Sequence, residues 1–270
     1  MTNPAVRRRR PAFAAGLATL AMALGFTAIP AGAAPTPRID YVALGDSFAA
    51  GQGAAPYTDP ACFVSRKGYP VIADNIRDVQ LTTNAGCSGQ VAADVVADAL
   101  AAVDSGTEIV TVTVGGNDLG TTNVLLACLP VPTTACAGAL ATVQTKLTDG
   151  SLAASLGGVV AAIRNKSLTA KIVFTGYPRL FAPDHPFAAV ANPLADGLNG
   201  VIAGVASGTG SQFVDVSGAF ATHGIGSAEP WINFSAAGVQ DPANFHPNSQ
   251  GYRQGYYASL VAQRAFVLGN

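Results

Sequence analysis

The feature that most constrains the fold of this chain is an alternation of short β-branched runs with longer alanine-rich runs. The short runs lie between turn-forming residues and predict five strands, at Arg38–Leu44, Val79–Asn84, Glu108–Val114, Lys171–Thr175 and Gln212–Val216. The longer runs have helical periodicity and predict helices, at Val91–Val103, Ser151–Arg164, Asn192–Val205 and Asn248–Phe266. Because strands that alternate with helices form parallel sheets covered on both faces, we predict an α/β fold. It is a three-layer α/β/α sandwich with a mainly parallel five-stranded sheet.

The helix at 91–103 has the clearest pattern, an apolar stripe formed by Val91, Val95, Ala99 and Val103. Three other segments lack periodicity and are rich in Pro, Gly and Thr; they are Gly120–Ala137, Arg179–Asn192 and Gly218–Phe245. We expect them to be loops over one end of the sheet, because long loops in compact domains are usually functional.

The N-terminal segment has the pattern of an export signal. Arg7–Arg10 form a basic region, and the apolar stretch Ala12–Ala28 follows it without a charge. Ala31-Gly32-Ala33 matches a cleavage site, so we predict a signal peptide over residues 1–33, cleaved after Ala33 or Ala34. A membrane anchor is the alternative, since the stretch is borderline in length for spanning a bilayer. We expect a secreted protein whose residues 34–270 form one domain, with no stable membrane insertion after cleavage.

Without the signal peptide the chain keeps 11 of its 15 Lys and Arg residues and all 16 Asp and Glu residues, for a formal net charge of −5. No basic stripe remains, which excludes nucleic acid as an expected partner. The sequence also has no H-E-x-x-H, no G-x-x-x-x-G-K-[ST] and no G-x-G-x-x-G motif. We therefore expect no cofactor and no metal, and we expect a monomer.

All four cysteines follow the signal peptide; they are Cys62, Cys87, Cys128 and Cys136. An even number of cysteines in an exported chain favours disulfides over free thiols. Of the three possible pairings we favour the one between sequence neighbours, Cys62–Cys87 and Cys128–Cys136. A zinc site is the competing interpretation, but the C-x2-4-C spacing typical of such sites is absent.

The first candidate for chemistry is a serine directly after a predicted strand. The strand ends in Gly45-Asp46-Ser47, and glycine permits the sharp turn that would place Ser47 at the carboxyl edge of the sheet, where open α/β folds bind ligands. A helix beginning here would also favour negative charge beside the hydroxyl. Ser47 is thus a candidate nucleophile, although a helix cap is the commoner role of such a serine.

Two more strand ends carry groups suited to binding an oxyanion. The segment Asn84–Gly89 follows the second strand, and Gly89 can expose its backbone amide. Gly115-Gly116-Asn117-Asp118 follows the third strand, and the side chain of Asn117 can donate a hydrogen bond. Ordinary turns are the alternative explanation of both segments.

Three histidines are candidates for a general base: His185, His223 and His246. His246 precedes Pro247 and the predicted last helix, so secondary structure would fix its position, whereas the other two lie in irregular segments. Taken singly, His246 has a surface or capping role as its alternative. The G-x-S-x-G elbow of α/β-hydrolases is absent, which disfavours that fold.

Together, Gly45-Asp46-Ser47, Gly89, Gly115-Gly116-Asn117-Asp118 and His246-Pro247 match in order the four blocks of the SGNH/GDSL hydrolase family. The chain resembles this family from about Ile39 to the end of the last helix, and its cysteine spacings resemble those of secreted actinobacterial lipases, esterases and phospholipases. The resemblance implies the flavodoxin-like SGNH hydrolase fold, with Ser47 as nucleophile and His246 as base. It also implies an oxyanion hole formed by the amides of Ser47 and Gly89 and the side chain of Asn117.

The chain departs from the family pattern at one position. Many members place an aspartate three residues before the histidine, and here that position is Ala243. Two interpretations follow. Either the carbonyl of Ala243 or Asn244 orients His246, which gives a Ser–His dyad, or Asp241 is the third member through a bent loop.

These residues predict a secreted carboxylic ester hydrolase, a lipase, esterase or phospholipase that forms an acyl-enzyme. We expect a lipid ester as substrate because the secreted relatives it resembles act on lipids. The rim segments also supply apolar side chains: Leu119, Leu125, Leu126, Leu129, Phe181, Trp231 and Phe234. The alternatives are a carbohydrate O-acetyl esterase and a catalytically silent protein that binds cell wall or lipid.

Overall fold

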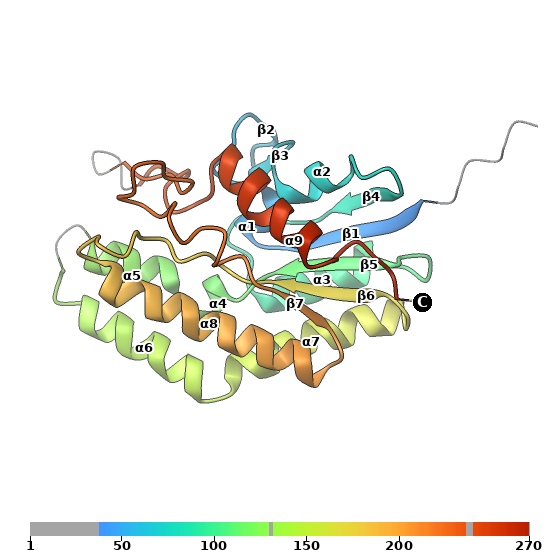
Figure 1. Ribbon diagram of the computed structural model, residues 1–270. Coiled ribbons are helices and arrows are strands. Elements are labelled where there is room, and N and C mark those ends of the chain that lie inside the picture. Colours follow the sequence, from blue (N-terminus) through green and yellow to red (C-terminus); the bar gives the residue numbers. More distant parts are fainter. Residues whose placement is uncertain (1–37, 130–131, 236–239, 270) are drawn as a thin grey trace, which may run out of the picture. The chain divides into compact units, whose positions relative to one another are not determined.

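The computed structural model describes residues 38–129, 132–235 and 240–269 (Figure 1). The predicted signal peptide, residues 1–33, lies outside the described residues. Five strands form one sheet: β1 (Ile39–Gly45), β4 (Val79–Asn84), β5 (Ile109–Thr113), β6 (Lys171–Thr175) and β7 (Gln212–Val214). They lie in the order β4-β1-β5-β6-β7, and every neighbouring pair is parallel. All five predicted strands are confirmed to within two residues at each end.

Helices cover both faces of this sheet, and Figure 1 shows one set on each side of it. Three helices pack together on one face: α3 (Ala92–Ala102), α7 (Ser151–Lys166) and α8 (Ala188–Gly208). On the other face lie α2 (Tyr69–Ala73), the π-helix η2 (Gly251–Tyr257) and α9 (Ala258–Ala262). The predicted three-layer sandwich is confirmed, and its strand order is that of flavodoxin-like folds.

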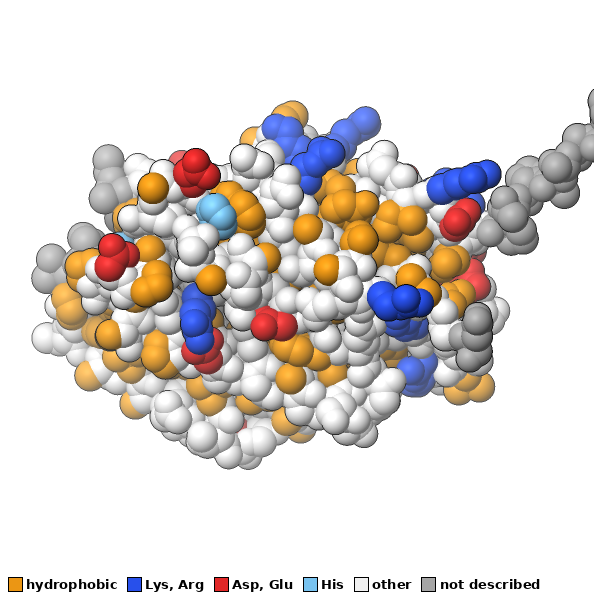
Figure 2. All heavy atoms as spheres, in the orientation of Figure 1, with side chains coloured by type: hydrophobic (Ala, Val, Ile, Leu, Met, Phe, Trp, Pro, Cys, Tyr) orange, Lys and Arg blue, Asp and Glu red, His pale blue; other side chains and the backbone are white. Residues whose placement is uncertain are grey.

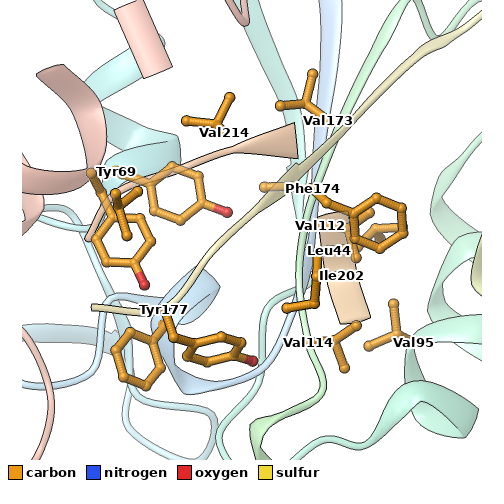
Figure 3. Close-up of a cluster of buried hydrophobic side chains, with 14 of the residues drawn as sticks. Leu44, Tyr69, Val95, Val112, Val114, Val173, Phe174, Tyr177, Ile202 and Val214 are labelled. Carbon is orange, nitrogen blue, oxygen red and sulfur yellow. The ribbon is translucent and has the colours of Figure 1, made fainter. Parts of the chain in front are cut away.

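The core lies on both sides of the sheet, because each strand alternates its side chains between the two helical layers. All five residues of β5 are buried. Figure 3 shows Val95 and Phe174 on one side of the strands, with Tyr69 and Tyr177 on the other. Of the apolar stripe predicted for the helix at 91–103, three residues are buried in this core, and Val91 is half-buried.

Two helices of eight or more residues were not predicted. Helix α5 (Thr121–Cys128) lies in the segment 120–137, which we expected to be a loop, and α6 (Cys136–Thr148) follows it. The loop prediction for this part of the segment is wrong. Helix α5 has eight residues, and three of them, Val124, Leu125 and Cys128, are buried, which is too short a run to show a helical period in the sequence. Helix α6 has one fully buried residue, Val143. Its sequence therefore shows no clear helical periodicity of apolar residues.

Two predicted helices have different bounds. Helix α8 begins at Ala188, four residues before the predicted start, and Pro193 lies inside it. Proline is typical of a first helical turn, but here five residues of the helix precede it. The predicted helix at 248–266 is instead η2 followed by α9, which ends at Ala262. Two short antiparallel strands, β2 (Tyr57–Asp59) and β3 (Val64–Ser65), were also not predicted.

Both predicted disulfides are present. Cys62–Cys87 joins the turn between β2 and β3 to the segment after β4. Cys128–Cys136 joins the end of α5 to the beginning of α6. The pairing of sequence neighbours is therefore confirmed, and the first bridge lies two residues before Gly89.

The described surface mixes charged and apolar side chains. On the face in Figure 2, Lys and Arg side chains lie in several separate groups among uncharged ones. Five large apolar side chains of the described residues are exposed: Leu100, Leu126, Leu168, Val261 and Val267. Of these five, Leu126 is the one that lines the cavity at the carboxyl edge of the sheet. The described residues contain no helix with the length and apolar character needed to cross a bilayer.

Candidate active site

Ser47 begins a short helix at the carboxyl end of β1. Gly45 turns the chain there with a φ of 134°, and a Cβ at this position would lie 2.1 Å from the carbonyl oxygen of Thr113 in β5. Asp46 then caps α1 (Ser47–Ala50), because its Oδ1 accepts the N–H of Phe48 at 2.9 Å. Glycine and aspartate together place the Ser47 hydroxyl at the edge of the sheet, where the structure opens into a cavity.

His246 reaches this hydroxyl from the segment before η2. Its Nε2 lies 2.8 Å from Ser47 Oγ, and its Nδ1 lies 2.8 Å from the carbonyl oxygen of Asn244. A carbonyl can only accept, so Nδ1 carries the proton in the neutral ring and Nε2 is free to accept from Ser47. The structure thus brings together the predicted serine and histidine, which lie 199 residues apart in the sequence.

Of the groups considered as orienting His246, the Asn244 carbonyl is the one at Nδ1. The carboxylate of Asp241 accepts the N–H of Ala243 at 2.8 Å, and the carbonyl of Ala243 accepts the N–H of His246 at 3.2 Å. Asp241 therefore stabilises the turn that precedes the ring. Phe245 has a φ of 65°, a left-handed conformation that is uncommon for a large residue. It lies between Asn244 and His246, whose carbonyl and Nδ1 form the hydrogen bond that orients the ring.

Among the described residues, no carboxylate is placed to favour the charged form of the imidazole. Burial lowers the pKa of His246 from the usual 6.5 to about 4, while the carbonyls of Asn244 and Pro242 act in the opposite direction. The ring also packs against Phe48, with 5.2 Å between the ring centroids. His246 is therefore neutral near pH 7, as a base that accepts a proton must be.

The predicted oxyanion donors line the same cavity as Ser47 and His246. Gly89 lies in a turn after Cys87 with a φ of 85°. Within the part of the chain that the structure describes, the amides of Ser47 and Gly89 donate to no acceptor. Asn117, in α4 (Gly116–Leu119), donates one side-chain hydrogen to the carbonyl of Gln90 at 2.9 Å, and the other hydrogen is free among these residues. Three N–H donors are thus available to a negatively charged oxygen.

A buried tyrosine that sequence reasoning missed joins two of these elements. The hydroxyl of Tyr177 donates to Asp46 Oδ2 at 2.5 Å and accepts the N–H of Gly116 at 3.3 Å. Burial raises the pKa of Asp46 to about 7, although the bond from Tyr177 lowers it. Tyr177 follows the end of β6 by two residues, and its place at the same sheet edge was the signal that could have revealed it.

The cavity has a volume of about 400 Å³ and two chemically different sides. Its polar side carries Ser47, His246 and the predicted oxyanion donors. Its apolar side, which we call the acyl wall, is formed mainly by α5 and α8 and consists of Val124, Leu125, Leu126, Leu180, Ala191, Leu194, Ala195 and Leu198. Such a pocket suits a ligand with one polar and one apolar end.

Two of the seven apolar side chains predicted at the rim, Leu125 and Leu126, line this cavity. Leu119 and Phe181 are buried in the core instead, and Trp231 stacks on His223 with 3.7 Å between ring centroids. Among the described residues no group of three or more His, Cys, Asp or Glu side chains is placed to hold a metal ion.

Comparison with known proteins decides the family. The profile of the GDSL-like Lipase/Acylhydrolase family matches residues 43–254, a span that contains Ser47, Gly89, Asn117 and His246. The chain belongs to this family. Within it, a lipase of Streptomyces rimosus is 34% identical over 264 residues, covering 94% of this chain and 97% of that protein.

Two solved enzyme structures are similar to this chain over most of their length. The extracellular lipase of Streptomyces rimosus has a TM-score of 0.75 and 33% identity, covering 83% of this chain and 99% of that one. Phospholipase A1 of Streptomyces albidoflavus NA297 has a TM-score of 0.75 and 29% identity, covering 84% of this chain and 99% of that one. As a member of the GDSL-like family with such relatives, the chain is an ester hydrolase.

Proposed function

We propose that this GDSL-family hydrolase is a secreted enzyme that cleaves lipid esters with a Ser47–His246 dyad. The observation that carries the proposal is the 2.8 Å contact between Ser47 Oγ and His246 Nε2, in a ring whose Nδ1 faces a main-chain carbonyl. This contact is within the distance over which a base can take the hydroxyl proton.

The reaction begins when His246 Nε2 takes the proton of Ser47 and Oγ attacks the ester carbonyl carbon. The carbonyl oxygen becomes an oxyanion, which the amides of Ser47 and Gly89 and the side chain of Asn117 stabilise. The tetrahedral intermediate collapses when His246 returns the proton to the leaving alcohol, and an acyl-Ser47 ester remains. His246 then takes a proton from water, and the resulting hydroxide attacks the acyl carbon. The bond from this carbon to Ser47 Oγ breaks, His246 returns the proton to Oγ, and the carboxylic acid leaves.

The acyl wall supports a lipid substrate. Each CH₂ group that leaves water contributes about 0.8 kcal/mol of binding free energy, so a chain lying against this wall gains affinity as it lengthens. The similarity to a Streptomyces lipase and to a phospholipase A1 points to the same substrate class.

Export is supported by two features of the chain. The basic and apolar pattern of residues 1–33 is that of a signal peptide, and the described cysteines form two disulfides, which persist in oxidising compartments.

The mechanism is tested by labelling the protein without residues 1–33 with a fluorophosphonate and measuring its intact mass. We expect one adduct, and none in Ser47→Ala, because the reagent requires an activated serine. An adduct that persists in Ser47→Ala would contradict the assignment of the nucleophile.

The substrate class is tested with p-nitrophenyl esters of acetate, octanoate and palmitate, followed by phospholipid against acetylated xylan. We expect kcat/KM for octanoate to exceed that for acetate, since the longer chain reaches the acyl wall. Activity confined to acetate, with hydrolysis of acetylated xylan, would make the protein a carbohydrate O-acetyl esterase.

A further inference from the structure

The bond that orients His246 does not by itself fix the distance between His246 and Ser47. Nδ1 of His246 donates to the carbonyl of Asn244, which lies two residues earlier in the same loop. The ring and its acceptor therefore move together whenever the loop moves. Some other contact has to hold this base loop, residues 241–247, against the segment that carries the nucleophile.

Asn233 makes such a contact. Its main chain pairs with the base loop, because its N–H donates to the carbonyl of His246 at 2.9 Å and its carbonyl accepts from Phe245 at 2.8 Å. Its side-chain Nδ2 donates to two carbonyls, those of Gly53 and His246, each at 3.0 Å. One hydrogen of the amide binds the base loop and the other binds the segment that follows α1.

Gly53 shows how closely these two segments approach. Its φ is 93°, and a Cβ at this position would lie 2.9 Å from the Cβ of His246 and 2.5 Å from the carbonyl oxygen of Pro247. A side chain at residue 53 therefore has no room, and the segments are joined by hydrogen bonds from the residues around it.

Gln52 makes the second contact across the same junction. Its main-chain N–H donates to the carbonyl of Ser47 at 3.0 Å, and its side-chain Nε2 donates to the carbonyl of Pro242 at 2.5 Å. The side chain is buried, and its Oε1 has no partner among the described residues. A buried acceptor without a partner destabilises the fold. The side chain of Gln52 nevertheless keeps the orientation in which it binds Pro242, although its own Oε1 then remains unpaired.

We propose that Gln52 and Asn233 are positioning residues, an amide clamp that holds the base loop so that His246 Nε2 stays within reach of Ser47 Oγ. The proposal rests on the Ser47–His246 dyad of the proposed function. Gln52 holds the loop four residues before His246, and Asn233 holds it at the carbonyl of His246 itself. In this proposal both act through His246; Gln52 lines the cavity that holds Ser47, whereas Asn233 does not.

The clamp is tested with two nearly isosteric variants that lack the amide donors, Gln52→Met and Asn233→Leu. A matched control is Gln212→Met, which removes a side-chain amide bond to the carbonyl of Gln263 at the amino end of β7. We expect each clamp variant to lower kcat by about 10-fold to 100-fold with KM changed less than about two-fold, since a small misplacement of a catalytic group has effects of this size. The control variant keeps the kcat of the unmodified protein.

A second readout separates positioning from general loss of structure. The rate of fluorophosphonate labelling should fall in parallel with kcat, and the downfield NMR resonance of the His246 Nδ1 proton should shift or broaden, while Tm stays high enough that the protein is folded at the assay temperature. The proposal is overturned if folded Gln52→Met and Asn233→Leu keep kcat within about two-fold, or if KM alone changes. A failure of the dyad itself is distinguishable, because then the unmodified protein would not be labelled at Ser47.

Discussion

At the residue scale, burial shifts the pKa values of two neighbouring groups of the site in the direction that favours their neutral forms. The pKa of His246 falls to about 4 because its ring leaves water without gaining a carboxylate partner. The pKa of Asp46 rises to about 7 for the same reason, although Tyr177 and the Phe48 amide bind its ionised form. His246 is therefore unprotonated above about pH 4, as its proposed role of base requires.

The low pKa of His246 predicts that the enzyme remains active at unusually acidic pH. The kcat/KM of the free enzyme falls when its base becomes protonated, so its acid limb should lie below pH 6.5 and toward about 4. The measurement is a pH–rate profile with a short soluble ester, with Tm recorded at each pH to show that the protein is folded. Ala243→Asp should move the limb upward, because a carboxylate near the ring favours its charged form. A limb at or above 6.5 in the unmodified protein would contradict the prediction.

At the element scale, α5 and α8 are what make the cavity apolar, and their side chains should set the preferred chain length. Ala191 of α8 lines the cavity, whereas Ala189, two residues earlier on the same helix, is exposed. We expect Ala191→Phe to fill part of the wall and to lower kcat/KM for a palmitate ester by about 10-fold or more relative to acetate. Ala189→Phe is the control and should leave this ratio unchanged. Equal losses on both esters in Ala191→Phe would show that the acyl chain lies elsewhere.

The two disulfides should affect different kinetic constants because they hold different elements. Cys62–Cys87 holds the turn that carries Gly89, and Cys128–Cys136 holds the end of α5. We expect replacing Cys62 and Cys87 by Ser to lower kcat, because an oxyanion donor becomes loose, and replacing Cys128 and Cys136 to raise KM for long-chain esters. Urea unfolding should show a loss of about 2–4 kcal/mol for each pair. Identical changes of kcat and KM in both double variants would show that the two disulfides do not have separate kinetic effects.

The strands, and the two residues that meet at the sheet edge, Ser47 and His246, could be predicted because their signals are local in the sequence. A β-branched run that ends in Gly45-Asp46-Ser47, and a histidine next to Pro247, are recognisable without the fold. The helices α5 and α6 could not be predicted, since α5 has eight residues and α6 has one fully buried residue, Val143, and therefore no apolar stripe. The position of Tyr177 just after β6 was visible in the sequence, but its bond to Asp46, 131 residues away, was not. No local pattern pointed to the bond between Gln52 and Pro242, which lie 190 residues apart.

At the scale of the whole molecule, Asp46 should make global stability depend on pH. Its carboxyl binds a proton more tightly in the folded state than in the unfolded state, where its pKa is near 3.8. The folded state therefore holds more protons between about pH 4 and 7, and the contribution of Asp46 to the free energy of unfolding falls as pH rises through this window. The titration of His246 acts in the opposite direction, since its folded pKa is lowered.

Asp46→Asn isolates this contribution, because asparagine does not titrate and His246 is present in both proteins. We expect the difference in unfolding free energy, unmodified protein minus variant, to fall by up to roughly 4 kcal/mol between pH 4 and 7 and to be constant above pH 8. Urea unfolding at four pH values measures it. A difference that rises with pH would show that Asp46 is ionised in the folded protein.

The disulfide between Cys62 and Cys87 also determines what proteolytic cleavage near it would do to the protein. Arg66 and Lys67 lie in the stretch that it encloses, and both are exposed. A cut after either residue would leave the two fragments covalently joined, with the turn that carries Gly89 still attached to the rest of the molecule. Such a nicked chain would migrate as one species until a reducing agent separated it.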